Sequence, residues 1–100
     1  MTTKEQAIKI AEKVLKDIDF WGDDVINPRA RLIEGENLSP NEKAYWLVGY
    51  NYGAEDFGPK AASVYVDVDV SSGKPALQVT TRNGSIPISY NAQNDKYSRV

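Results

Sequence analysis

The fold is decided by two neighbouring stretches, Tyr45-Trp46-Leu47-Val48-Gly49-Tyr50-Asn51-Tyr52 and Val64-Tyr65-Val66-Asp67-Val68-Asp69-Val70. The first has apolar side chains at both odd and even positions, which is typical of a strand covered on both faces. The second alternates valine with tyrosine and aspartate, which is typical of a strand with one buried and one exposed face. We therefore expect two adjacent strands, with the valines of residues 62–71 inward and Tyr65, Asp67 and Asp69 outward.

An amphipathic helix is expected before these strands, over about residues 3–18. Its apolar positions recur with the helical period: Ala7, Ile8, Ala11, Val14, Leu15 and Ile18. Thr2 and Thr3 precede Glu5 and Gln6 at the spacing of a capping box, in which side chains satisfy the first free N–H groups of a helix. The helix should cover Trp46, Val48 and the valines of the second strand.

Three further strands are predicted over about residues 29–35, 76–82 and 85–90. Asn83-Gly84 indicates a type I′ hairpin turn between the last two. Pro87 lacks an N–H group and therefore predicts that residues 85–90 form an edge strand. Residues 91–100 are polar and are expected to be a flexible tail. The fold class is α+β, a single domain over residues 1–100. Its N-terminal helix packs on one face of a curved, four- to five-stranded antiparallel sheet, cystatin-like or similar.

The composition argues against enzyme chemistry, because the 100 residues include no Cys and no His. The commonest general base, thiolate nucleophiles and most transition-metal ligands are therefore missing. Asp67-Val68-Asp69-Val70-Ser71 places oxygen ligands at alternate positions, but the chain lacks the Gly and Glu that an EF-hand loop requires afterwards. We expect a protein that is not an enzyme and that holds no metal and no cofactor.

The acidic residues are concentrated between residues 17 and 69, where only Arg29, Arg31, Lys43 and Lys60 are basic. An acidic surface repels nucleic acid and attracts basic protein surfaces, although it also serves simply as a solvated exterior. No apolar run is long enough to span a membrane, and no secretory signal is visible at residues 1–6. These features predict a cytoplasmic protein with a basic protein partner, no nucleic acid and no membrane.

Two loops combine aromatic and acidic residues. Asp19-Phe20-Trp21-Gly22-Asp23-Asp24 follows the helix, and its aromatic side chains either pack over the helix end or form a partner-binding prong. Residues 53–59 carry Phe57 beside two acidic residues. Exposed aromatic residues next to carboxylates are suited to a protein interface with a basic partner. The candidate partner-binding residues are Trp21, Asp23, Asp24, Tyr52, Glu55, Asp56, Phe57, Tyr65, Asp67 and Asp69.

The helix start Glu5-Gln6-Ala7-Ile8-Lys9-Ile10-Ala11-Glu12, the strand Tyr45-Trp46-Leu47-Val48-Gly49-Tyr50, and Ser63-Val64-Tyr65-Val66-Asp67 with Ser72-Gly73 carry a resemblance. The chain resembles YrhB-like toxin-immunity proteins and PepSY-like inhibitor domains of bacteria. The first resemblance implies an immunity-type inhibitor that neutralises a cognate toxin. The second implies a cystatin-like modulator of a peptidase. Neither implies catalytic residues.

Two alternatives stay open. A small ligand could bind in a pocket between the helix and the sheet, with polar groups supplied by Tyr50 or Tyr65. A free sheet edge, at residues 29–35 or 85–90, could pair with a second copy. The sequence is therefore compatible with a monomer or a weak homodimer.

Overall fold

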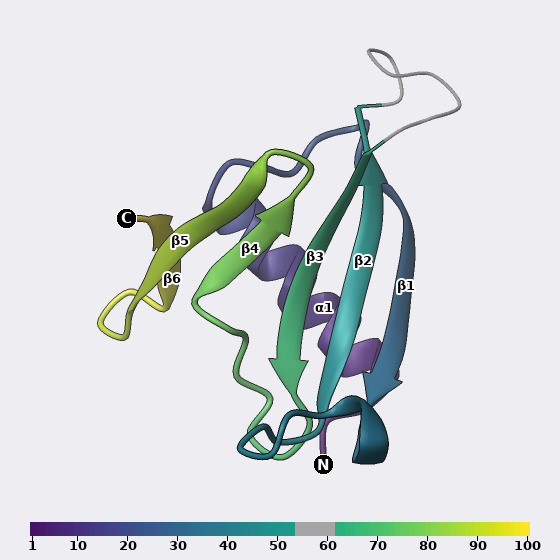
Figure 1. The fold of residues 1–100 in the computed structure, drawn as a ribbon. Coiled ribbons are helices and arrows are strands. Elements are labelled where there is room, and N and C mark those ends of the chain that lie inside the picture. The colour runs from purple at the N-terminus through teal and green to yellow at the C-terminus, as the bar shows by residue number, and fades with distance from the viewer. Residues whose placement is uncertain (54–61) are drawn as a thin grey trace.

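The computed structural model describes residues 1–53 and 62–100. Over these residues the chain forms one α-helix, one short 3₁₀ helix and a six-stranded antiparallel sheet (Figure 1). The elements are α1 (Lys4–Asp17), β1 (Ile26–Ile33), η1 (Gly35–Asn37), β2 (Tyr45–Tyr52), β3 (Ala62–Asp69), β4 (Gln78–Thr81), β5 (Gly84–Asn91) and β6 (Lys96–Arg99). The strands lie side by side in chain order, from β1 to β6.

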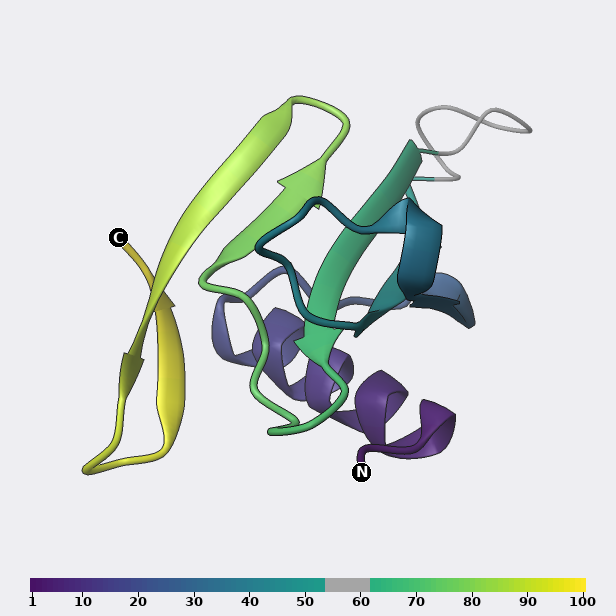
Figure 2. The same ribbon diagram turned by 60° about the horizontal axis from the view of Figure 1, so that its bottom comes forward.

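The sheet has one covered face, against which α1 lies (Figure 1). Figure 2 shows that the β5–β6 hairpin curves around toward the C-terminal end of the helix. The α+β class and the antiparallel sheet are as predicted, but the sheet has six strands where four to five were expected. Among the described residues, no helix has the length and apolar character needed to cross a bilayer.

The helix begins where the sequence predicts. Thr3 is its N-cap: the Thr3 hydroxyl accepts a 3.2 Å hydrogen bond from the Gln6 N–H, and the Gln6 side chain accepts one of 2.9 Å from the Thr3 N–H. This reciprocal pair is the expected capping box. The buried face of the helix consists of Ala7, Ala11, Val14 and Leu15. Their spacing places them on one stripe, which packs on the sheet.

β2 and β3 form the centre of the core. Val48 pairs with Val66, and Tyr50 with Val64, on the face under the helix. Trp46 lies on the same face and donates a 3.0 Å hydrogen bond from its indole N–H to the Thr2 carbonyl. The strict alternation of β3 is confirmed, since its valines are buried while Tyr65, Asp67 and Asp69 are only partly buried.

The expected tail contains a sixth strand, so the sheet continues past β5. β6 pairs with β5 from Ile88↔Arg99 to Asn91↔Lys96, and β5 is therefore an interior strand, which corrects the expectation of an edge. The Ile88 N–H donates to Leu77 on the β4 side, so the Pro87 nitrogen faces the β6 side. There β6 has already ended, and the Pro87 carbonyl accepts from the Val100 N–H at 3.1 Å. The hydrogen bond that proline cannot donate would go to residue 100, just past the end of β6, so no bond between β5 and Lys96–Arg99 is lost.

The β4–β5 hairpin occurs where the sequence predicts it, but its turn is different. Thr81 pairs with Gly84, so the two turn residues are Arg82 and Asn83. A type I′ turn would require positive φ at both of them. Positive φ occurs instead at Gly84, at +116°, where only glycine is unstrained.

Candidate functional site

The sheet face opposite α1 carries a group of charged, aromatic and apolar side chains that are exposed or partly exposed. On β1, β2 and β3 the registered rows are Arg29–Gly49–Tyr65, Arg31–Leu47–Asp67 and Ile33–Tyr45–Asp69. The side chains of one row lie on one face, because directly paired residues in an antiparallel sheet point the same way. We call this surface the outer face; its residues are Arg29, Arg31, Tyr45, Leu47, Tyr65, Asp67 and Asp69. The connection from η1 to β2 folds toward the lower end of this face (Figures 1 and 2).

The upper part of the outer face is an ordered cluster of an arginine and a tyrosine. Arg29 donates 3.1 Å hydrogen bonds to the side-chain oxygens of Asn51 and Ser63. The Tyr65 ring lies against the backbone of Gly49, where an added Cβ would be 2.9 Å from the ring. Hydrogen bonding with Ser63 and with Arg29 lowers the pKa of Tyr65. These contacts hold the ring and the guanidinium in place.

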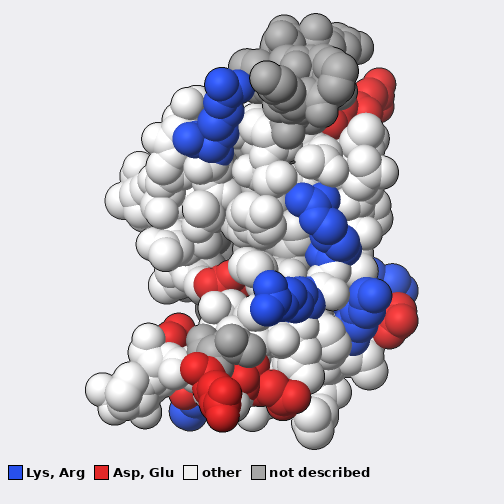
Figure 3. Space-filling model, turned by 45° about the vertical axis from the view of Figure 1, so that its right-hand side comes forward, with Lys and Arg blue, Asp and Glu red and all other residues white. Residues whose placement is uncertain are grey.

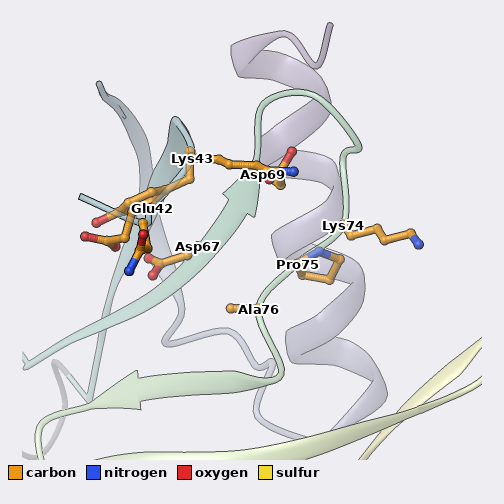
Figure 4. Close-up of a pocket in the computed structure, with 9 residues that line it drawn as sticks. Glu42, Lys43, Asp67, Asp69, Lys74, Pro75 and Ala76 are labelled. Atoms are coloured by element: carbon orange, nitrogen blue, oxygen red, sulfur yellow. The ribbon is translucent and has the colours of Figure 1, made fainter. Parts of the chain in front are cut away.

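The lower part of the outer face is a hollow of about 370 Å³. Its lining residues come from the segment before β2, the first residue of β2, β3, and the β3–β4 connection: Asn41, Glu42, Lys43, Tyr45, Asp67, Asp69, Lys74, Pro75 and Ala76. Figure 4 shows Glu42 and Asp67 on one side of the hollow, with Lys43 extending toward Asp69 and Lys74 pointing away. The hollow thus combines apolar walls with the carboxylates of Glu42, Asp67 and Asp69 and with two lysines, Lys43 and Lys74.

Asp67 is the electrostatically unfavourable group of this hollow. Burial raises the pKa of its carboxyl group, and the nearby Glu42 carboxylate raises it further. Over residues 1–53 and 62–100, Asp67 has no side-chain hydrogen bond and no ion pair. The pKa of Tyr45 is raised as well, by burial and by the charges of Asp67 and Glu42. The carboxyl groups of Asp67 and Glu42 therefore lie close together, and within the described residues no cation is bonded to Asp67.

Asp69, also predicted as a binding residue, has a structural role. Its Oδ1 accepts hydrogen bonds of 2.8 Å from the N–H groups of both Ser71 and Ser72. The Ser72 bond in particular lowers the pKa of Asp69, and the charge of Lys43 adds to this effect. Asp69 thereby stabilises the turn that follows β3.

Trp21 and Tyr52, predicted as binding residues, make packing contacts. The Trp21 ring meets Tyr50 edge to face at 5.3 Å, with the Lys16 ammonium 5.5 Å from its centroid. Tyr52 packs in the same way against Phe20, at 5.0 Å, and its hydroxyl accepts from the Arg82 N–H. Both side chains are partly buried. Their contacts are those of the packing alternative, in which the loop after α1 covers the core.

The remaining predicted residues lie away from the hollow or outside the described ranges. Asp24 accepts a 3.1 Å hydrogen bond from the Gly53 N–H, at the end of β2 opposite the hollow. Asp23 is exposed in the same loop. Glu55, Asp56 and Phe57 lie outside the described residues. Of the described candidates, the structure brings only Tyr65, Asp67 and Asp69 together on the outer face.

Sequence reasoning missed Arg29, Arg31, Tyr45 and Leu47 on the outer face and Glu42 in the lining of the hollow. Tyr45 and Leu47 were assigned to a second covered face of their strand, whereas α1 covers only the opposite face. Glu42 reaches the hollow through a turn in which its carboxylate accepts from the Ser39 N–H at 2.8 Å. The period-two pattern of β2 identifies which side chains share a face, but not that the face is open.

A second concave surface lies between α1 and the β5–β6 hairpin, with a volume of about 490 Å³. Its lining includes Ile10, Leu77, Tyr90 and Tyr97. Tyr50, which the small-ligand interpretation would use, is buried and donates its hydroxyl to the Ile8 carbonyl at 3.0 Å. That hydroxyl is therefore already hydrogen-bonded inside the core.

Over the described ranges, no group of three or more acidic side chains is arranged to hold a metal ion. No family model, curated protein or solved structure matches the chain, so its own geometry is the basis for assigning a function.

Proposed function

We propose that this protein is a non-enzymatic protein-binding module, an immunity-type inhibitor that neutralises a cognate toxin through the outer face. The observation that carries the proposal is Asp67, which is half-buried beside Glu42 and has no hydrogen bond or ion pair in the part of the chain that the structure describes. A carboxylate in this situation is stabilised when a cation approaches. We infer that a lysine or arginine side chain of the partner enters the hollow.

The hollow offers three kinds of contact to such a side chain. The carboxylates of Asp67 and Glu42 accept charge-assisted hydrogen bonds from an ammonium or guanidinium group. The ring of Tyr45 provides a surface for a cation–π contact. Pro75 and Ala76 contact the aliphatic part of the entering chain. Lys74 extends away from the hollow (Figure 4), so it leaves the Asp67 side open.

The rest of the outer face gives the partner an orientation. Arg31 lies on the same row as Asp67, with Leu47 between them, and Arg29 lies on the next row. Figure 3 shows acidic side chains gathered toward the lower end of this side of the molecule and basic side chains across the strands above them. A partner with a basic residue near Asp67 and an acidic residue near Arg31 would match both regions in one orientation only.

The resemblance of the sequence to YrhB-like immunity proteins supports an inhibitor that acts by covering its target. A helix on a curved sheet is also the cystatin-like arrangement expected for PepSY-like modulators of peptidases. In either case the proposed activity is binding alone, since the outer face has no histidine or cysteine to perform catalysis. The identity of the target decides between the two families.

The test uses the protein encoded by the neighbouring gene, with binding measured by calorimetry at 50 mM and 300 mM salt. Asp67→Asn should weaken binding about tenfold and reduce its dependence on salt, because it removes one charge from the hollow while nearly preserving its shape. Asp23→Asn is the matched control at the opposite end of the sheet and should bind like the wild type.

Equal binding by the wild type and Asp67→Asn would refute the hollow as the contact site. Weakening by Asp23→Asn alone would instead assign the interface to the loop after α1. Growth of cells that produce the neighbouring protein tests the inhibitor class: rescue by the wild type and loss of rescue by Asp67→Asn are the expected results. A neighbouring peptidase whose activity changes would support the PepSY-like alternative.

A further inference from the structure

The two edges of the sheet, β6 and β1, differ in how far the rest of the described chain covers them. At β6 the Tyr97 N–H donates to the Asp17 carboxylate at 3.1 Å, and the Arg99 side chain donates to the Ile18 carbonyl at 3.0 Å. The end of α1 therefore covers this edge. At β1, six of the eight residues are exposed, and only Ala30 and Ile33 are not. β1 forms the right-hand border of the sheet in Figure 1.

The backbone groups that β1 leaves unpaired can be identified from the register. The Val70 N–H donates to the Ala44 carbonyl, so the backbone of residue 44 faces β3. Alternate residues of a strand face opposite neighbours, and Tyr45, Leu47 and Gly49 therefore face β1. They pair with Ile33, Arg31 and Arg29. The N–H and C=O groups of Ala30 and Leu32 consequently point out of the sheet.

No described turn, loop, cap or side chain bonds to these four groups of Ala30 and Leu32. The stretch they belong to is short, because the register is irregular between Ile26 and Arg29 and Asn27 has a positive φ of 58°. Over residues 29–33, however, the strand is regular and its outward backbone is accessible. Such an edge is able to accept one more strand.

The side chains along this edge define which strand would fit. Arg31 lies on the outer face, is exposed, and forms no hydrogen bond or ion pair within the described ranges. Leu32 lies on the opposite face, beside the helix, and is 37% exposed despite being apolar. An added strand places its alternate side chains next to Arg31 and next to Leu32. Acidic residues suit the first position and apolar residues the second.

We propose that β1 binds an extended segment of another protein, in which acidic and apolar residues alternate, as an added strand. Main-chain hydrogen bonds to Ala30 and Leu32 hold the segment, an acidic side chain pairs with Arg31, and an apolar side chain covers Leu32. This is recognition by strand addition, in which backbone bonds supply affinity and alternate side chains supply specificity.

A second copy of the chain is the wrong occupant for this edge. In a two-fold dimer with both helices on one side, β1 would pair antiparallel with itself and keep residues of the same face opposite each other. When the two-fold axis passes through Ala30, the pairing places Arg29 opposite Arg31 twice. When the axis passes through Arg31, the pairing places Arg31 opposite Arg31. Like charges directly opposite each other destabilise a strand pair. The two arginines therefore act against self-association in both registers that pair most of residues 29–33, while a register centred on Leu32 would pair only residues 31–33 within β1.

This proposal is tested separately from the inhibitor function, because it concerns the edge of β1, uses neither Asp67 nor the hollow, and shares only Arg31 with the proposed inhibitor surface. Its test uses a capped synthetic heptapeptide, Thr-Val-Glu-Val-Glu-Val-Thr, with a matched peptide in which lysine replaces glutamate. Amide hydrogen exchange followed by NMR is the readout. The glutamate peptide should slow exchange at Ala30 and Leu32 at least fivefold, while Arg29 and Arg31, already paired with β2, should change little.

The variant Arg31→Glu checks the charge preference. It should weaken binding of the glutamate peptide about fivefold and strengthen binding of the lysine peptide by a similar factor. Lys9→Glu, an equal change of charge on an exposed position of α1, should leave both affinities unchanged. Because Arg31 is exposed, its replacement is compatible with folding.

Three results would overturn the proposal. The first is unchanged exchange at Ala30 and Leu32 with millimolar glutamate peptide. The second is equal binding of both peptides by the wild type and by Arg31→Glu, which removes the recognition of an acidic strand. The third is protection of these two amides by protein concentration alone, with a dimer seen in sedimentation, which would make the second copy the occupant.

Discussion

The hydroxyl of Tyr50 donates a 3.0 Å hydrogen bond to the carbonyl oxygen of Ile8, and so joins β2 to the middle of α1. Among the described residues, Tyr50 is the largest fully buried side chain, with 1% of its surface exposed. Its ring also receives the edge of Trp21. One side chain thus connects the helix, the central strand and the loop that leaves the helix.

Tyr50→Phe should lower the free energy of unfolding by about 1 kcal/mol, since it removes one buried hydrogen bond and leaves the ring in place. Urea unfolding followed by circular dichroism measures the change. Tyr90→Phe is the control, because the Tyr90 hydroxyl bonds Asp95 on the exposed hairpin, and its effect should stay within about 0.5 kcal/mol. Equal losses in the two variants would contradict a special role for the buried bond.

Stability should fall at alkaline pH, and Tyr50 should contribute to the fall. Burial, with the charge of Glu12, raises the pKa of Tyr50 to about 12 from the 10.0 of an exposed tyrosine. The folded protein then holds a proton that the unfolded chain loses, so the contribution is complete below pH 10 and disappears as the pH rises toward 12. Urea midpoints between pH 8 and 11.5 should decline less steeply in Tyr50→Phe. A parallel decline would mean that other groups cause the loss.

Gly49→Ala should disturb the outer face, because the new Cβ would lie 2.9 Å from the Tyr65 ring. The ring has to move, and we expect a loss of about 1 kcal/mol. In a double-mutant cycle, Gly49→Ala should cost much less when Tyr65 is already replaced by alanine. Additive effects of the two replacements would show that the glycine is required for another reason.

Asp17→Ala should release β6 from the helix. The Asp17 carboxylate accepts from the Lys13 ammonium at 2.7 Å and from the Tyr97 N–H at 3.1 Å. We expect a loss of about 1–3 kcal/mol and faster hydrogen exchange across β5 and β6. Glu12→Ala, which removes the exposed 3.3 Å pair with Lys16, is the control and should change stability by less than about 0.5 kcal/mol. Unchanged exchange at Tyr97 would count against the link.

The same carboxylate predicts a response to acid. Burial raises the pKa of Asp17, but the hydrogen bonds from Lys13 and Tyr97 outweigh this effect and lower it below the usual 3.8. Its contribution to stability is therefore present above pH 3.8 and disappears as the pH falls through the lowered pKa. Asp17→Ala should accordingly lose less stability than the wild type on acidification.

Asp67→Asn, in contrast to Asp17→Ala, should raise the free energy of unfolding at pH 7, by up to about 0.5 kcal/mol. Burial and Glu42 raise the pKa of Asp67, so the folded protein binds this proton more strongly than the unfolded chain does. As the pH falls from neutral toward the raised pKa, the wild type should become more stable relative to Asp67→Asn. Asp69→Ala, which removes the acceptor for Ser71 and Ser72, should destabilise by about 1 kcal/mol. A less stable Asp67→Asn protein would contradict the unfavourable charge proposed here.

The parts of the fold that depend on local pattern could be predicted from the sequence. Thr3 and Gln6 mark the start of α1, and the alternation of residues 62–69 identifies the buried face of β3. Strand β6 could not be predicted in this way. Its residues, Lys96-Tyr97-Ser98-Arg99, have no apolar alternation, and Pro87 indicates an edge. β6 is held by contacts with Asp17 and Ile18, about 80 residues away, which a local pattern does not contain.

The candidate site shows the same division. The alternation of residues along β3 predicts that Tyr65, Asp67 and Asp69 point outward, and the structure confirms it. The roles of individual residues depend on long-range contacts: Trp21 meets Tyr50, and Asp24 meets Gly53. A prediction that groups acidic residues by their position in the sequence therefore assigns to one site side chains that lie at opposite ends of the sheet.

The bonds between α1 and β6 also have a kinetic consequence. Neighbouring strands pair in chain order, so each hairpin can form after a short loop closes, on the microsecond scale. Docking β6 on the helix instead joins residues separated by 80 to 82 positions. Closing so long a loop has a larger entropic cost than closing a hairpin. We therefore expect the helix and β1–β3 to be structured in the folding transition state. The β5–β6 hairpin should dock afterwards, so that replacements at Asp17 speed unfolding and leave the folding rate almost unchanged.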